Sequence, residues 1–254
     1  MKQADCAIAM ASGAEAASQL ASLVLLDSDF SAMPGVVAEG RRVINNIQRA
    51  ASLFLVKNIF SLFLSIISFF TVWPYPLEPI HLSVISAMTI GLPSFILTFE
   101  PRYDRVKGRF LPEVLRRAFP GGLTNVFVVL LCQMFMSVFA LPSEEVSTIC
   151  AAILSFVGLL VLFQICKPFN WFRRTLWWAM AAGIVLCFTL LGDILDLRAW
   201  SSEVRLVMFT LLVMTPTVFF AIQRVFDWAE QTRLRFVAWC KGLWARRPFR
   251  KKAA

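Results

Sequence analysis

The sequence predicts a mainly α-helical protein that crosses a membrane several times, and three observations support this fold class. Hydrophobic residues make up 58% of the 254 residues, and the mean hydropathy is +0.70, which exceeds that of an ordinary soluble domain. Apolar runs of about 20 residues, the length that crosses a bilayer, recur along the chain. Lys and Arg gather in every second loop between these runs.

Six apolar runs predict six membrane spans. They cover about residues 51–73, 80–99, 120–141, 147–166, 175–195 and 204–223. Basic residues precede the first span, lie between the second and third and between the fourth and fifth, and follow the sixth. The opposite loops hold only Arg198 and Arg205. Because cytoplasmic loops carry the excess of Lys and Arg, both termini are expected in the cytoplasm. The net charge of +9 then reflects membrane topology, and we expect no nucleic-acid partner.

Residues 1–34 differ from the rest of the chain and predict a small α/β element. Two short apolar runs, residues 7–10 and 23–26, flank an Ala-rich segment with high helix propensity. This pattern indicates a strand, a helix and a second strand, with the two strands parallel. About 30 residues cannot bury both faces of a parallel sheet, so we expect this element to be the end of a larger cytoplasmic domain.

Residues 35–50 are predicted to form a stalk helix that continues into the six-helix membrane domain, residues 51–223. No breaker separates the stalk from the first span, and one helix that joins a cytoplasmic domain to the membrane can transmit motion between them. Residues 224–254 are predicted to be a basic cytoplasmic tail. Its interleaved aromatic residues suit either an amphipathic segment on anionic lipid or a solvated tail.

Polar residues follow one helical stripe on each of the first two spans. Asn58 and Ser61 lie three residues apart on the first span, and Ser86 and Thr89 lie three apart on the second. Amide and hydroxyl oxygens are hard ligands that Na⁺, K⁺, Ca²⁺ and Mg²⁺ prefer. The stripes therefore predict part of a cation path. Ser and Thr also hold membrane helices together, so a packing role remains the alternative.

A helix break is predicted within the second span, at Gly91 and Pro93. Proline donates no hydrogen bond and its ring presses on the carbonyl four residues back, while glycine lets the backbone bend. A broken helix inside a membrane is tolerated only where protein or water surrounds the freed groups. Lys57, beside Asn58, would add positive charge to the stripe, but we expect it to extend toward the cytoplasmic face.

Four motifs resemble P-type ATPases, in the same order along the chain. Residues 5–10 resemble the strand after the hinge motif, and residues 22–30 resemble the end of the phosphorylation domain. Residues 39–46 resemble the stalk before the fifth membrane helix, and residues 89–101 resemble the sixth helix. The likeness covers residues 5–105, and beyond them the span layout and loop charges agree with it.

The resemblance implies the C-terminal part of a bacterial-type cation-transporting P-type ATPase: the end of a HAD-like phosphorylation domain and membrane helices five to ten. Such pumps couple ATP hydrolysis to transport through an aspartyl phosphate, and their phosphorylation and nucleotide-binding motifs precede the part that matches residue 1. ATP and Mg²⁺ are thus implied for the full-length parent and neither for this chain alone. The implied partners are membrane lipid, the transported cation and the missing N-terminal part, in a plasma (inner) membrane.

This sequence departs from the calcium-pump branch at three ligand positions, two of which are carboxylates in that branch. Ser61 stands at the position of a Glu, Ser86 at that of an Asn and Ile90 at that of an Asp, while Asn58 and Thr89 match. The cation, calcium or another divalent or a monovalent ion, therefore stays open. A stand-alone six-span channel or secondary transporter is one alternative, and a non-functional truncated product is another. Residues 1–34, which make no complete domain, argue against the stand-alone transporter.

Overall fold

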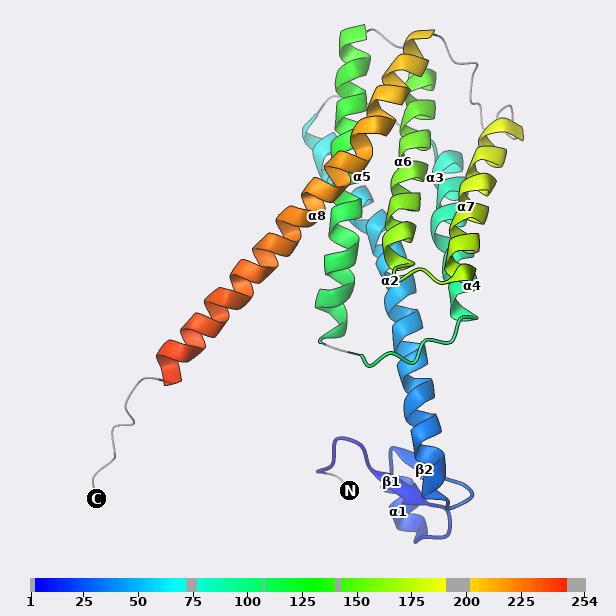
Figure 1. Cartoon of the computed structure of the whole chain (residues 1–254), viewed down its shortest axis with the longest axis vertical. Coiled ribbons are helices and arrows are strands. Elements are labelled where there is room, and N and C mark those ends of the chain that lie inside the picture. The colour runs from blue at the N-terminus through cyan, green and yellow to red at the C-terminus, as the bar shows by residue number, and fades with distance from the viewer. Residues whose placement is uncertain (1–2, 72–76, 107, 140–142, 191–201, 246–254) are drawn as a thin grey trace. The chain divides into compact units, whose positions relative to one another are not determined.

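The computed structural model describes residues 3–71, 77–106, 108–139, 143–190 and 202–245, and most of them are helical (Figure 1). The chain divides into two compact units. The first comprises Met1–Ile47 and Pro101–Lys107, and the second comprises Gln48–Glu100 and Gly108–Ala254. A predominantly helical membrane fold with a small N-terminal sheet confirms the predicted fold class.

The first unit contains the strand–helix–strand element that the sequence predicts. Strand β1 (Ile8–Met10), helix α1 (Glu15–Leu20) and strand β2 (Leu23–Leu25) follow one another. The two strands are parallel, with Ile8 opposite Leu23 and Met10 opposite Leu25. Leu26, directly after β2, is 82% exposed. An apolar side chain so exposed agrees with a sheet too small to bury both of its faces.

A short 3₁₀ turn, η1 (Phe30–Ala32), leads into helix α2 (Met33–Phe70). The Asp29 carboxylate accepts hydrogen bonds from the Ser31 hydroxyl and from its amide at 2.8 Å, and these bonds hold the pKa of Asp29 below its ordinary value. Helix α2 is 38 residues long and contains both the predicted stalk and most of the predicted first span. In the stalk part of this helix, the Asn45 amide donates to the carbonyls of Arg102 and Asp104, at 3.3 and 2.9 Å.

The second span is helical throughout and changes its winding at the predicted break. Helix α3 (Pro79–Ser86) passes into a π-helical segment, η2 (Ala87–Gly91), and then into helix α4 (Leu92–Thr98). The Leu92 amide donates to the carbonyl of Ala87, five residues back. Wider π turns accommodate residues that disturb the regular ladder, so Pro93 enters the helix without leaving a segment of coil.

Four longer helices complete the second unit: α5 (Phe110–Phe139), α6 (Ser143–Ile165), α7 (Trp171–Leu190) and α8 (Ser202–Ala245). Helix α5 begins ten residues before the expected start of its span, and Pro120 lies inside it. Helix α8 runs 44 residues, through the sixth predicted span and into the predicted basic tail.

Among the described residues, five helical segments are long and apolar enough to cross a membrane: Phe30–Phe70, Pro79–Thr98, Phe110–Phe135, Glu145–Ile165 and Arg205–Arg233. Helix α7, in the fifth predicted span, is not among them. Arg173 and Arg174 near its start lower its mean hydropathy, and residues 191–195 of that predicted span lie outside the described residues.

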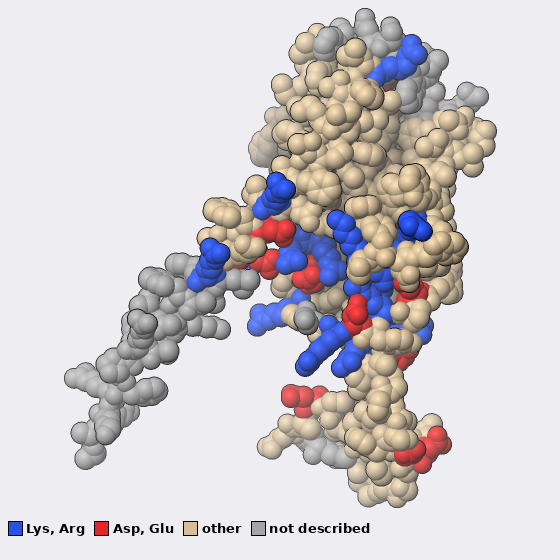
Figure 2. All heavy atoms as spheres, viewed as in Figure 1, with Lys and Arg blue, Asp and Glu red and all other residues tan. Residues whose placement is uncertain are grey.

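Helix α6 forms the centre of the packed unit, against α5 and α8 (Figure 1). Several of its side chains have no exposed surface, among them Cys150, Ile153, Val157 and Leu162. Large apolar side chains such as Phe95, Phe127 and Phe209 are instead exposed. In Figure 2 most charged side chains of this unit gather toward one end of its helices, and apolar or uncharged atoms dominate the rest of the visible face. Both features are expected of a surface that faces lipid.

Candidate cation-binding cavity

A cavity of about 40 Å³ lies inside the second unit, between α2, α3, η2, α5 and α6. A buried water needs roughly 10–15 Å³, so the cavity has room for a few water-sized groups. Most of its lining is apolar: Leu53, Val56, Phe60, Leu82, Ile85, Ile90, Leu154, Gly158 and Val161. Its polar lining consists of Lys57, Ser86, Thr89 and Asn125.

Ser86 and Thr89 enter the lining from the second span, as the sequence stripe predicts for two residues on one helical face. The Ser86 hydroxyl donates to the carbonyl of Leu82. The Thr89 hydroxyl donates to the carbonyl of Ile85 at 2.7 Å, and Thr89 is 3% exposed. Because each hydroxyl has given its hydrogen to its own helix, only oxygen lone pairs remain for a ligand.

Asn125, on α5, is a polar residue of the cavity that the sequence reasoning missed. It is 6% exposed, and its Oδ1 has no hydrogen-bond partner among the described residues. Buried polar atoms in folded proteins nearly always have a partner, so such an acceptor needs an explanation. An amide within an apolar span is the signal that could have found it in the sequence.

The structure does not bring Asn58 and Ser61 to this cavity. Both residues are exposed on α2. The buried face of that helix instead carries Leu53, Val56 and Phe60, which line the cavity. A helix turns about 100° per residue, so Lys57 reaches the lining from the edge of this face while Asn58 points away from it.

Close backbone approaches hold the walls of the cavity together. A Cβ added at Gly158 on α6 would lie 2.6 Å from Cγ2 of Thr89. Added at Gly121 and Gly122 on α5, it would lie 2.5 Å from Val161 and 2.6 Å from Ile59. These distances are shorter than van der Waals contact, so glycine is required for the helices to lie so near one another.

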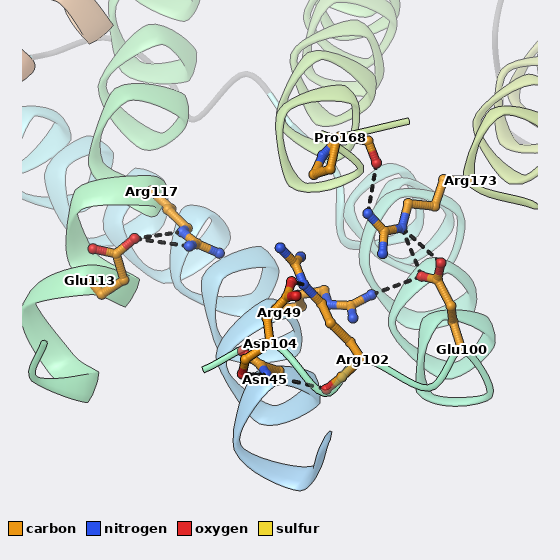
Figure 3. Close-up of polar contacts among 9 residues, drawn as sticks. All are labelled: Asn45, Arg49, Glu100, Arg102, Asp104, Glu113, Arg117, Pro168 and Arg173. Atoms are coloured by element: carbon orange, nitrogen blue, oxygen red, sulfur yellow. Dashed lines mark hydrogen bonds and ion pairs between the residues drawn. The ribbon is translucent and has the colours of Figure 1, made fainter. Parts of the chain in front are cut away.

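A buried cluster of charged residues lies elsewhere in the same unit (Figure 3). Arg173 Nε on α7 lies 3.0 and 2.8 Å from the two carboxylate oxygens of Glu100, and Arg49 Nη1 on α2 lies 3.2 Å from one of them. The three side chains are 9%, 11% and 3% exposed. Arg173 also donates to the carbonyl of Pro168 at 2.7 Å. The cluster joins α2, α7 and the turn that follows α4, and no local pattern in the sequence predicts it.

The two polar arrangements differ in the groups they contain. The cavity offers neutral oxygens, and within the described ranges no three His, Cys, Asp or Glu side chains come together. The fold defines a polytopic helical membrane protein with a small, mostly apolar cavity beside its second span.

Comparison with known proteins gives the family. No protein-family model matches the chain. It is 38% identical over 181 residues to a protein of Streptococcus pneumoniae named probable cation-transporting ATPase exp7, which covers 68% of this chain and 23% of that protein. It is 36% identical over 205 residues to the calcium-transporting ATPase CtpE of Mycolicibacterium smegmatis, covering 75% of this chain and 26% of that protein. A calcium-transporting ATPase of Bacillus subtilis is 30% identical over 109 residues, 42% of this chain and 12% of that protein.

The chain is therefore a homologue of cation-transporting P-type ATPases and matches a membrane portion of them. It spans about a quarter of the length of the Streptococcus pneumoniae and Mycolicibacterium smegmatis relatives.

Proposed function

We propose that the chain forms the membrane part of an ATP-driven cation pump and contributes part of the cation path, without being catalytically complete alone. The observation that carries this proposal is the similarity to ATPases named for cation or calcium transport, over 181 and 205 residues. A second observation is α2, one helix of 38 residues in which the stalk and the first span are continuous. Such a helix can couple events outside the membrane to its interior.

The proposed path contains Asn58, Ser61, Ser86 and Thr89, near the winding change at Gly91 and Pro93. Ser86 and Thr89 support it because both residues line the cavity. Asn58 and Ser61 lie on the exposed face of α2. An amide and a hydroxyl on that face are poorly suited to lipid, so further membrane helices of the pump are expected to cover them.

The remaining part of the pump would bind ATP and Mg²⁺ and carry the phosphorylated aspartate, as the family implies. We place the protein in the plasma (inner) membrane with both termini in the cytoplasm, because the basic residues of the sequence fall in alternate loops. The phosphorylation reaction itself needs residues of that remaining part, while this chain would hold the cation and transmit its occupancy.

The test is a split pump. The chain is produced together with the Streptococcus pneumoniae relative from which the matched 181-residue region has been removed. Cation-stimulated ATP hydrolysis is then measured in membranes from cells that make both pieces or either one. We expect hydrolysis only with both pieces, and none when the phosphorylated aspartate of the relative is replaced.

Two results contradict the proposal. One is equal hydrolysis with and without the chain. The other is passage of cations through liposomes that contain the purified chain alone, without ATP, at a rate typical of a channel. The second result would favour a stand-alone six-span channel.

A further inference from the structure

A surface of basic and aromatic side chains lies where α6 passes into α7. We define this basic–aromatic surface by five exposed residues of the second unit: Lys167, Phe169, Trp171, Arg174 and Trp178. Trp171 is 71% exposed and Trp178 is 64% exposed. Because residues three or four apart share one face of a helix, Trp171, Arg174 and Trp178 form a single stripe along α7.

The two cationic groups of this surface have no counter-ion in the part of the chain that the structure describes. Neither Lys167 nor Arg174 forms an ion pair with a described Asp or Glu, and the sequence holds no acidic residue from 146 to 192. Arg173 differs from its neighbour, since it is buried and paired with Glu100 at 2.8 Å (Figure 3). Two positive charges of the surface are thus available to a negative group from outside the chain.

Contacts to the bundle hold the segment that carries these charges. Arg173 donates to the Pro168 carbonyl at 2.7 Å. The ammonium group of Lys167 lies 5.0 Å from the ring centroid of Phe163 on α6, and the ring of Phe169 lies 4.8 Å from the same ring. A surface that is already ordered loses less conformational entropy when it binds a ligand.

The position of the surface relative to the spans indicates lipid as its partner. The α6 span ends at Ile165, and Lys167 follows after one residue. In Figure 1 the connection from α6 to α7 lies at the end of the unit where α4 ends. Exposed tryptophan beside Lys or Arg is typical of the headgroup region of a membrane, where the indole lies among lipid and the cation remains in water.

We propose that the basic–aromatic surface binds the headgroup of an anionic phospholipid. Arg174 and Lys167 would pair with its phosphate, and Trp171 and Trp178 would lie beside its glycerol and upper acyl chains. A zwitterionic headgroup carries its own cation next to the phosphate. Two cationic side chains without an acidic neighbour therefore favour a lipid whose net charge is negative.

The test uses two photoreactive lipids, phosphatidylglycerol and phosphatidylcholine, with the same reactive group near the glycerol. Each is added to liposomes that contain the full 254-residue chain, and mass spectrometry measures its attachment to residues 163–178. We expect phosphatidylglycerol to label this segment about fivefold more than phosphatidylcholine. The double variant Lys167→Gln with Arg174→Gln should bring the ratio close to one. Trp171→Ala should lower labelling by both lipids and leave their ratio unchanged, because an indole carries no charge.

Arg41→Gln is the matched control, since Arg41 is exposed on the stalk part of α2 and its loss changes the net charge equally. It should leave the ratio unchanged, and an equal fall in this variant would overturn the proposal, because net charge alone would then set the preference. Unchanged labelling by phosphatidylcholine in the double variant shows that the segment still folds at the lipid surface.

The exchanged variant Lys167→Arg with Arg174→Lys keeps both charges and should keep the preference even if the double variant fails to fold. Equal labelling of the unmodified chain by the two lipids overturns the proposal, as does a preference that survives the loss of both charges or disappears in the exchanged variant. Weak labelling by both lipids also overturns it, because protein would then cover the surface. The assay needs no ATP, so its outcome is independent of the split pump.

Discussion

Thr89 of η2 and Gly158 of α6 touch directly, so that a single methyl group on Gly158 would lie 2.6 Å from Cγ2 and 2.7 Å from Cβ of Thr89. The contact places the π-helical segment, whose Thr89 lines the cavity, against the most deeply buried helix of the unit. Packing at this point therefore determines both the stability of the bundle and the shape of the cavity.

Gly158→Ala should destabilise the chain by about 1–3 kcal/mol, because the methyl group must displace Thr89 or separate η2 from α6. Thermal unfolding in detergent, followed by circular dichroism, measures the effect. Gly183→Ala on α7 is the control, since its Cβ would meet only Met88 Sδ at an ordinary 3.6 Å. Equal stability of the two variants would show that the close approach is not maintained.

Glu100→Gln should cost about 3–5 kcal/mol, because it leaves the buried Arg49 and Arg173 side chains without their shared carboxylate. Chemical unfolding of the purified chain tests this value. The control is Glu39→Gln, which removes a 3.2 Å pair with Arg42 whose two side chains are half exposed. An exposed pair of this kind contributes about 0.5 kcal/mol or less. The prediction fails if both substitutions have the same small effect.

Asn58→Ala should raise the cation concentration for half-maximal ATP hydrolysis in the joined pump. Asn58 is exposed in this chain, and the further membrane helices of the pump are expected to cover it. Loss of an amide partner that is buried in this way costs about 1–3 kcal/mol, which corresponds to roughly a 5- to 150-fold change. Ser65→Ala, two turns further along the same stripe of α2, should have a much smaller effect. Small and equal shifts in both variants, at matched expression, would mean that the stripe only packs helices.

Single cysteines in a variant that lacks the six native ones should report the topology. A membrane-impermeant thiol reagent should label Glu78→Cys from outside the cell and Arg105→Cys only after the membrane is opened. The reason is the excess of Lys and Arg in the loop that contains Arg105. Labelling of Arg105→Cys in intact cells would overturn the six-span assignment.

The purified chain alone should neither hydrolyse ATP nor form an acid-stable phosphoenzyme, since its sequence shows no phosphate-cradling glycine-rich loop and no nucleophile with an adjacent base. Incubation with radioactive ATP, followed by acid precipitation, measures both. A mock preparation from cells that do not make the chain gives the background from contaminating host ATPases. Phosphorylation of the chain would contradict the assignment of catalysis to another part of the pump.

The sequence by itself determined the properties that depend on local composition. Apolar runs and loop charges predict a polytopic helical membrane fold, and two short apolar runs predict the parallel pair of β1 and β2, which the structure contains. The absence of a breaker between residues 35 and 73 predicts the continuous helix that α2 forms as far as Phe70. The motifs of residues 5–105 identify the family that the relatives confirm.

Only the tertiary structure decided which side chains meet. Asn125 joins Ser86 and Thr89 at the cavity, Glu100 joins Arg173, and Asn58 faces away from the bundle. Hydropathy cannot distinguish these cases, because a membrane helix is apolar on the side that faces lipid and on the side that faces protein alike. The buried face is chosen by the close approach of neighbouring helices, at glycines whose partners lie far away in the sequence.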